Sequence, residues 1–167
     1  MRNSGATPFK WRRQFIGLTI FLCSAYEPAI SQTLTVYTVQ NLSFGSFSQG
    51  ISGGTVIISN TGSRSVTGSV VPLNLNTPYL QAIIEVEAAA GTIVTILNGS
   101  DATLTGSNGG TMSMNIGSSD PASPFTTSAV PPARTQVNIG GTLTVGSPTL
   151  SPAGTYSGTF YITFNYQ

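Results

Sequence analysis

Short runs of alternating apolar and polar residues recur from about residue 33 to the end of the chain. Turn-forming Gly, Asn, Ser and Pro residues separate these runs, and a helical repeat of apolar residues is nearly absent. Such spacing is typical of an all-β sandwich or barrel with antiparallel neighbours. The pattern predicts strands near residues 33–39, 54–59, 66–73, 79–88, 91–97, 110–116, 135–145 and 155–166.

The segment 82–90 is the one place where helix and strand signals compete. Its alanines favour a helix, but its apolar residues recur every second position. One face would carry Leu80, Ala82, Ile84, Val86 and Ala88. The opposite face would carry Gln81, Glu85 and Glu87. We therefore expect a strand with one buried face.

The C-terminal segment 154–167 carries the clearest alternation in the chain. Its even positions are Tyr156, Gly158, Phe160, Ile162, Phe164 and Tyr166, and its odd positions are mostly polar. Burial of the four large side chains from Phe160 onward stabilises the fold by at most about 6–12 kcal/mol. Since a whole domain is stable by about 5–15 kcal/mol, truncation at Ala153 is expected to unfold it.

Four short motifs resemble those of a bacterial family, domain of unknown function 4402. They are the run Leu42–Gly45, the run Gly140–Val145, the run Gly154–Phe160 and the closing pair Asn165–Tyr166. The resemblance spans nearly all of the chain after the leader and is weakest between Gly99 and Arg134. It implies an exported β-sandwich of immunoglobulin-like or pilin-like type, with no catalytic residues to carry over.

A more distant similarity is to chaperone–usher pilus subunits and spore-coat-protein-U-like domains. The penultimate aromatic Tyr166 and the glycine Gly154 match the pattern of their last strand. The similarity implies that this strand pairs with a periplasmic chaperone or with copies of the chain. The expected pairing residues are Leu34, Val36, Gly154, Tyr156, Phe160, Ile162, Phe164 and Tyr166. Segment Thr33–Val39 is either a donor extension or the sandwich's own first strand.

The N-terminus resembles a secretory signal peptide. Arg2, Lys10, Arg12 and Arg13 precede the apolar run 15–23, which is too short to span a bilayer. We expect residues 1–31 to be the signal, with cleavage before Gln32, and residues 32–167 to be a single domain without a stable membrane span. The expected location is the periplasm, the cell surface or the medium. Both the general and the twin-arginine export routes remain open.

The amino-acid composition excludes several kinds of catalytic and binding site. Charged residues make up 7% of the chain against roughly 25% in soluble domains, His is absent and Cys occurs once. The chain alone therefore cannot build a His/Cys zinc site, a Ser-His-Asp triad or a Cys-His dyad. A net charge of +1 gives no basic surface for nucleic acid. We expect neither an enzyme nor a cofactor.

Three polar sites invite a chemical interpretation. Ser52 lies in a G-x-S-x-G pattern, but without a His base we interpret it as part of a glycine-rich loop. Glu85 and Glu87 share a strand face, which suits a solvated surface better than acid–base chemistry or a cation. Asp101 and Asp120 are typical turn residues, with loop-bound calcium as the alternative. No metal site is predicted.

A ligand surface is the remaining possibility. Tyr79 and Phe125 are aromatic residues outside the clear core pattern, and the proline-broken segment Gly117–Arg134 is predicted to be a long surface loop. The favoured function is structural or adhesive, as in a pilus-like subunit that assembles by strand pairing. The alternative is a secreted ligand- or carbohydrate-binding module.

Overall fold

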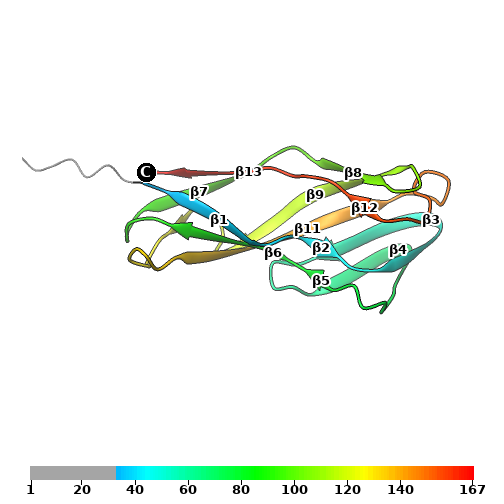
Figure 1. The fold of residues 1–167 in the computed structure, drawn as a ribbon, viewed down its shortest axis with the longest axis horizontal. Coiled ribbons are helices and arrows are strands. Elements are labelled where there is room, and N and C mark those ends of the chain that lie inside the picture. Colours follow the sequence, from blue (N-terminus) through cyan, green and yellow to red (C-terminus); the bar gives the residue numbers. More distant parts are fainter. Residues whose placement is uncertain (1–32) are drawn as a thin grey trace, which may run out of the picture. The chain divides into compact units, whose positions relative to one another are not determined.

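The computed structural model describes residues 33–167, and within that range it contains strands and no helix. No helix there is long and apolar enough to cross a membrane. The predicted signal peptide and its cleavage point before Gln32 lie outside the described residues. The strands are β1 (Thr35–Gln40), β2 (Ser43–Phe44), β3 (Phe47–Ile58), β4 (Arg64–Pro72), β5 (Tyr79–Leu80), β6 (Ala82–Glu87), β7 (Ile93–Asn98), β8 (Ala102–Gly106), β9 (Thr111–Asp120), β10 (Phe125–Thr126), β11 (Thr135–Val145), β12 (Tyr156–Ser157) and β13 (Ile162–Tyr166) (Figure 1).

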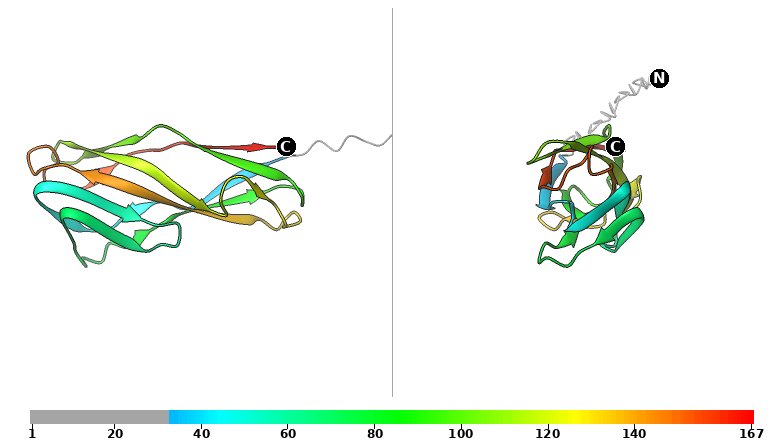
Figure 2. Two further views of the ribbon diagram at one scale, coloured as in Figure 1. Left: turned by 180° about the vertical axis from the view of Figure 1, so that it is seen from behind. Right: turned by 90° about the vertical axis from the view of Figure 1, so that its right-hand side faces the viewer.

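Strand β11 is the centre of the main sheet. Its first part, Thr135–Ile139, pairs with β6, which in turn pairs with β1. Its second part, Gly141–Val145, pairs with β3, and its other edge pairs with β9, followed by β8 and β12. All pairs between these strands are antiparallel, and the sheet curls strongly (Figure 2). The predicted all-β sandwich-like fold is confirmed.

Two smaller sheets, β10–β7–β13 and β2–β5, complete the enclosure of the core. Alternate residues of each long strand face inward, as period-two patterning requires. In β6 the inward residues Ala82, Ile84 and Val86 are buried, so the strand expected near 79–88 is confirmed for 82–87, whereas Tyr79 and Leu80 form β5 in another sheet. The three buried residues of β6 pack in one cluster with β11, β9 and β7 side chains, including Val137, Ile139, Leu143, Met114, Val94 and Ile96.

Strand β3 is longer than predicted because it continues through the glycine-rich segment 50–54. The register of its pairing with β4 shifts between Gln49 and Gly54. Such a shift is a β-bulge, and a bulge bends the strand that contains it. Gly53 has φ 66°, and a Cβ there would collide with the carbonyl oxygen of Val145. Ser52 is an exposed residue of this bulge, and no helix follows it. The nucleophile-elbow context is therefore not present.

The segment Gly117–Arg134 was expected to be a surface loop, and that expectation is wrong in part. Strand β9 runs on to Asp120, and β10 pairs with β7 through Phe125↔Val94. Thr127 is 2% exposed, and its hydroxyl donates a hydrogen bond of 2.6 Å to the carbonyl oxygen of Ala89. Prolines exclude a central strand, but they permit short edge pairing.

The C-terminal segment is two strands rather than one. Strand β12 pairs with β8 in the main sheet, whereas β13 pairs with β7 in the smaller sheet. The predicted alternation is present, because Phe160, Ile162 and Phe164 are half-buried and their odd-numbered neighbours are exposed. Tyr166 is 45% exposed, so its expected burial is wrong.

Candidate functional site

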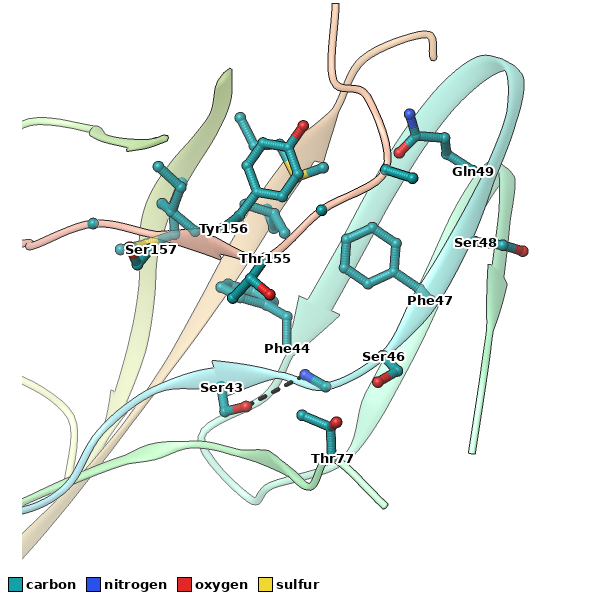
Figure 3. Close-up of a pocket in the computed structure, with 18 of the residues that line it drawn as sticks. Ser43, Phe44, Ser46, Phe47, Ser48, Gln49, Thr77, Thr155, Tyr156 and Ser157 are labelled. Atoms are coloured by element: carbon teal, nitrogen blue, oxygen red, sulfur yellow. Dashed lines mark hydrogen bonds between the residues drawn. The ribbon is translucent and has the colours of Figure 1, made fainter. Parts of the chain in front are cut away.

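A groove of about 810 Å³ opens between two segments from opposite ends of the described chain. One wall is Leu42–Gln49, from β2 and the start of β3, and the other is Pro152–Gly158, around β12. The two wall segments run in opposite directions (Figure 3). Leu104, Met112, Met114 and Leu143, from strands β8, β9 and β11, also line it.

Both walls are strand edges without a strand partner on the groove side, within residues 33–167. Strand β2 pairs only with β5, Phe47–Gln49 of β3 pairs only with β4, and β12 pairs only with β8. An open edge presents backbone N–H and C=O groups that can pair with another strand. The groove therefore lies between two such edges.

Five of the partly buried apolar residues that pack against the core also line the groove: Leu42, Phe47, Leu104, Tyr156 and Phe160. Partly buried apolar residues that pack against the core are Leu34, Leu42, Phe47, Val66, Leu104, Tyr156, Phe160, Ile162 and Phe164. Most of them belong either to the N-terminal stretch 34–47 or to the C-terminal stretch 156–164. Side chains left half-covered beside a buried core are typical of an interaction surface.

Arg64 builds the N-terminal wall. Its guanidinium donates hydrogen bonds to the carbonyl oxygens of Phe44 at 3.3 Å, Ser46 at 3.1 Å and Leu73 at 3.5 Å. The Tyr79 ring stacks on it with the centroid 4.4 Å from Cζ. One cation thus fixes three backbone carbonyls that border the groove.

The backbone of this wall turns at Gly45, between β2 and β3. The φ of Gly45 is 69°, and a Cβ would lie 2.9 Å from Nη1 of Arg64. Its N–H points to the Ser43 hydroxyl at 3.4 Å, and that hydroxyl donates to the Pro78 carbonyl oxygen at 2.7 Å (Figure 3). The motif Leu42–Gly45 is therefore the structural basis of the wall.

The opposite wall is tied to the core by hydroxyl groups. Tyr156 donates from Oη to the Pro152 carbonyl oxygen at 2.6 Å. Ser151 is fully buried and donates from Oγ to the Thr111 carbonyl oxygen at 2.8 Å. Gln49 Nε2 donates across the groove to the Ser151 carbonyl oxygen. This hydrogen bond joins the two walls near one end.

The lining carries no charged residue. Its polar groups are Ser, Thr and Tyr hydroxyls and the Gln49 amide, and the rest is apolar or glycine. Such a lining can accept an uncharged, extended chain, whose backbone pairs with an edge while alternate side chains face the apolar floor. The lining contains no carboxylate, imidazole, amine or thiol side chain.

The predicted pairing residues lie in three places. Gly154, Tyr156 and Phe160 line the groove, whereas Ile162, Phe164 and Tyr166 belong to β13 on β7. Val36 lies in β1, opposite Val86 of β6, and Leu34 precedes that strand. In this structure the segment Thr33–Val39 thus forms the sandwich's own first strand.

The two predicted ligand-surface aromatics do not form a surface together. Phe125 is 8% exposed and belongs to the core cluster, so its prediction as a surface residue is wrong. Tyr79 is 43% exposed, but its ring stacks on Arg64. They lie in different sheets, in β10 and β5 respectively.

Glu85 and Glu87 do not face bare solvent. Both carboxylates pair with Arg134, from Glu85 Oε2 to Nη1 at 3.1 Å and from Glu87 Oε2 to Nε at 3.2 Å. The hydrogen bond that Arg134 donates to Glu85, followed by the one that it donates to Glu87, raises the pKa of Arg134. The guanidinium also lies 3.6 Å from the centroid of the Tyr37 ring in β1.

The other acids of interest have ordinary roles. Asp101 accepts a hydrogen bond of 2.7 Å from Asn115 Nδ2, and Asp120 ends β9. Among residues 33–167, no group of three or more metal-binding side chains is found.

Sequence analysis missed the N-terminal wall, although it singled out the run Leu42–Gly45 for its resemblance. The sequence feature that could have indicated this wall is that run followed by the mixed polar and apolar residues up to Gln49. Its role depends on Arg64 and on β12, which are distant in sequence and meet it only in the fold.

A family model described as a domain of unknown function (DUF4402) matches residues 34–166. No curated protein and no solved structure matches the chain.

Proposed function

The chain belongs to the DUF4402 family, a domain of unknown function, and because that family offers no activity to transfer, we propose a function from the groove. The protein is an exported structural or adhesive subunit of the bacterial surface. It assembles with copies of itself when an extended strand of one copy enters the groove of the next. It acts by binding and without catalysis.

One observation carries this proposal: the groove lies between two strand edges that have no partner on that side in residues 33–167. A strand placed there would pair its backbone with an edge and bury alternate side chains against Met112, Met114 and Leu143. It would also cover Phe47 and Tyr156, which are now half-buried. A small polar ligand would neither pair with the backbone groups of the two strand edges nor cover the apolar side chains between them.

Two features of the sequence support export and close packing of copies. The basic and apolar N-terminal stretch is typical of a signal peptide. The charged residues of the described chain are Arg64, Glu85, Glu87, Asp101, Asp120 and Arg134. So few charges give little repulsion between neighbouring copies.

We expect the exported protein to run as a ladder on an SDS gel when unheated and as a monomer when boiled, because inserted strands resist detergent. The substitution Ser157→Arg places a long cation in the lining and should shorten or abolish the ladder. The matched control is Thr103→Arg, which adds the same cation at an exposed position of β8 outside the groove lining.

Circular dichroism melting establishes that both variants are folded. A ladder that survives Ser157→Arg as fully as Thr103→Arg would contradict the groove as the assembly site. A monomer in unheated wild-type samples at every concentration would contradict assembly by strand insertion.

A further inference from the structure

We propose that the outer face of the small sheet β10–β7–β13 binds an extended, uncharged polysaccharide, with Tyr161 as the platform for one sugar ring. This site is separate from the groove, whose lining includes neither Tyr161 nor any residue of β7 or β13. It goes beyond the proposed assembly, because it needs a single copy of the chain. The outer face is defined as Ile93, Thr95, Leu97, Gly99, Thr126, Tyr161, Thr163, Asn165 and Gln167.

The register of β13 on β7 brings the outward residues of the two strands together (Figure 1). Ile162 and Phe164 pack against the core, so the odd-numbered residues of β13 point outward. Cross-strand neighbours on the outer face are the pairs Tyr161–Gly99, Thr163–Leu97, Asn165–Thr95 and Gln167–Ile93. Thr126 of β10 lies opposite Ile93 on its other side. All nine residues are exposed except Thr95, which is half-buried.

Tyr161 is the most exposed aromatic residue in the described part of the chain, at 76%. Its cross-strand neighbour Gly99 has no side chain that could cover the ring. Within residues 33–167 no arginine stacks on this ring, in contrast to the rings of Tyr37 and Tyr79. An uncovered tyrosine offers an apolar ring face and a polar hydroxyl at its edge. A sugar ring carries the matching surfaces, because its C–H groups form apolar faces and its hydroxyls lie around the rim.

The outward residues that follow Tyr161 along β13 are polar and uncharged. They are Thr163, Asn165 and Gln167, and all three are exposed. Outward residues of a strand lie about 6.6 Å apart, so they present hydroxyl and amide groups at a regular spacing. Hydroxyl and amide side chains both donate and accept hydrogen bonds, as sugar hydroxyls do. The row therefore suits a polymer that continues from the ring on Tyr161.

The outer face carries no charge. The six charged residues of the described chain all lie outside it. Asp101 is the one nearest to Gly99 in the sequence, and its carboxylate accepts a hydrogen bond of 2.7 Å from Asn115 of β9 in the main sheet. An anionic polymer would find no cation on this face, and a cationic one would find no anion. These features favour a neutral polysaccharide.

A protein partner fits this face less well. Its large apolar residues besides Tyr161 are Leu97 and Ile93, which are 49% and 46% exposed. Thr95 separates these two along β7, so they do not form one continuous patch. A stable protein interface buries about 800 Å² on each partner around an apolar centre. The alternation of apolar and polar side chains here matches a sugar polymer better.

Affinity electrophoresis tests the proposal. The exported protein is run in native gels that contain hydroxyethylcellulose, xylan, mannan or dextran, and in a gel without polysaccharide. We expect at least one of these neutral polymers to retard the wild type. Tyr161→Ala should weaken that binding about 10-fold, whereas Tyr161→Trp should keep it, because a larger ring is still a platform. Retardation by none of the four polymers, or equal retardation of the wild type and Tyr161→Ala, would overturn the proposal.

Matched variants separate the outer face from the rest of the surface. Asn165→Ala should weaken binding about 3-fold through the loss of one hydrogen-bonding side chain. Thr144→Ala removes an exposed polar side chain from β11, and Tyr79→Ala removes an exposed aromatic from β5. Both controls should bind as the wild type does, after circular dichroism has shown that they are folded. Equal losses in Tyr79→Ala and Tyr161→Ala would contradict a specific platform at Tyr161.

Salt dependence tests the charge of the ligand. Raising NaCl from about 50 mM to about 500 mM should change the affinity by less than about 2-fold, because a neutral polymer has no charge to screen. A steep fall in affinity would contradict a neutral ligand.

Sedimentation velocity tests whether a second copy covers the outer face instead. Tyr161→Ala should leave the distribution of oligomers unchanged. If it disperses oligomers and leaves retardation by polysaccharide as it was, the face is a contact between copies and the proposal is wrong. Polysaccharide binding by a protein that forms no ladder would support this site and contradict the assembly proposed above.

Discussion

Arg64 donates hydrogen bonds to backbone carbonyl oxygens, which elsewhere in the sheets is done by the N–H groups of a neighbouring strand. Three carbonyl oxygens, from Phe44, Ser46 and Leu73, converge on its guanidinium. Arginine suits this position because its planar fork donates in several fixed directions, which a lysine ammonium cannot match. The shape of the groove wall therefore depends on one side chain.

We expect Arg64→Met to lower the free energy of unfolding by about 1–3 kcal/mol, because it leaves hydrogen-bonded carbonyls without their donor. Arg64→Lys should lie between this variant and the wild type, since it keeps the charge but loses the fork. Urea denaturation measures all three. Equal stability of the methionine variant and the wild type would show that the wall stands without the guanidinium.

Residue roles were only partly predictable from the sequence. Phe125 was predicted to be a candidate surface residue because it lies outside the clear core pattern, yet it is buried and its strand pairs with β7. Tyr79 was identified as exposed, but its cation partner Arg64 is fifteen positions away and in another strand. Exposure of an isolated aromatic depends on which distant strands approach it, and local pattern does not contain that information.

At the scale of the element, alternation predicts faces better than it predicts partners. The faces of β6 and of the C-terminal segment follow the pattern of their sequences. The same pattern gave no sign that the C-terminal segment leaves β8 after Ser157 and joins β7 at Ile162. A change of sheet is set by the ends of the neighbouring strands, which lie far away in the sequence.

Phe160 and Tyr161 make a matched test of these faces. Phe160 is half-buried against the core, whereas Tyr161 is 76% exposed. We expect Phe160→Ala to lower the free energy of unfolding by about 1–3 kcal/mol, less than for a fully buried Phe. Tyr161→Ala should change it by no more than about 0.5 kcal/mol. Thermal or urea unfolding decides between them, and a larger effect at Tyr161 would contradict the assigned faces.

Glycine and proline residues predicted where the backbone bends better than they predicted which segments pair as strands. The segment 50–54 is indeed a bend, but it lies inside β3 as a bulge. The segment 117–134 is indeed broken, but β9 and β10 still pair at its start and middle. Both residue types limit backbone geometry, and they do not by themselves end a ladder.

At the scale of the whole molecule, the scarcity of charge governs the response to conditions. The chain has no His, the residue that ordinarily titrates near neutral pH. The pKa of Arg134 is raised by its hydrogen bonds to Glu85 and Glu87. A raised pKa stabilises the fold below the unfolded-state value and loses that effect only as pH rises through the folded-state value, far above neutrality.

The melting temperature of the domain should therefore change by less than about 2 °C between about pH 6 and about pH 9. Differential scanning calorimetry in buffers of equal ionic strength measures this. A steep dependence in that range would contradict this expectation, because apart from the α-amino group and Cys23 the sequence supplies no group that ordinarily titrates there.

The fold class was predictable because most of the long strands carry their own local pattern, although β2, β8 and β10 were not predicted. The groove was not, because its lining comes from five separate regions of the chain, around residues 42–49, 73–77, 104–114, 143–148 and 152–160. No local signal marks an edge as unpartnered. Only the arrangement of sheets shows that β2, the start of β3 and β12 each have one strand partner and none on the groove side within residues 33–167.

The proposed contact, between the groove of one copy and an extended strand of the next, would join two unlike surfaces of one chain. A contact between unlike surfaces is heterologous, so it repeats from copy to copy and gives a ring or an open filament. An open filament has two unlike ends, one with an empty groove and the other with an unused strand. A single protein that plugs either end would set the filament's length, so growth would be directional and a few terminating molecules would control many subunits.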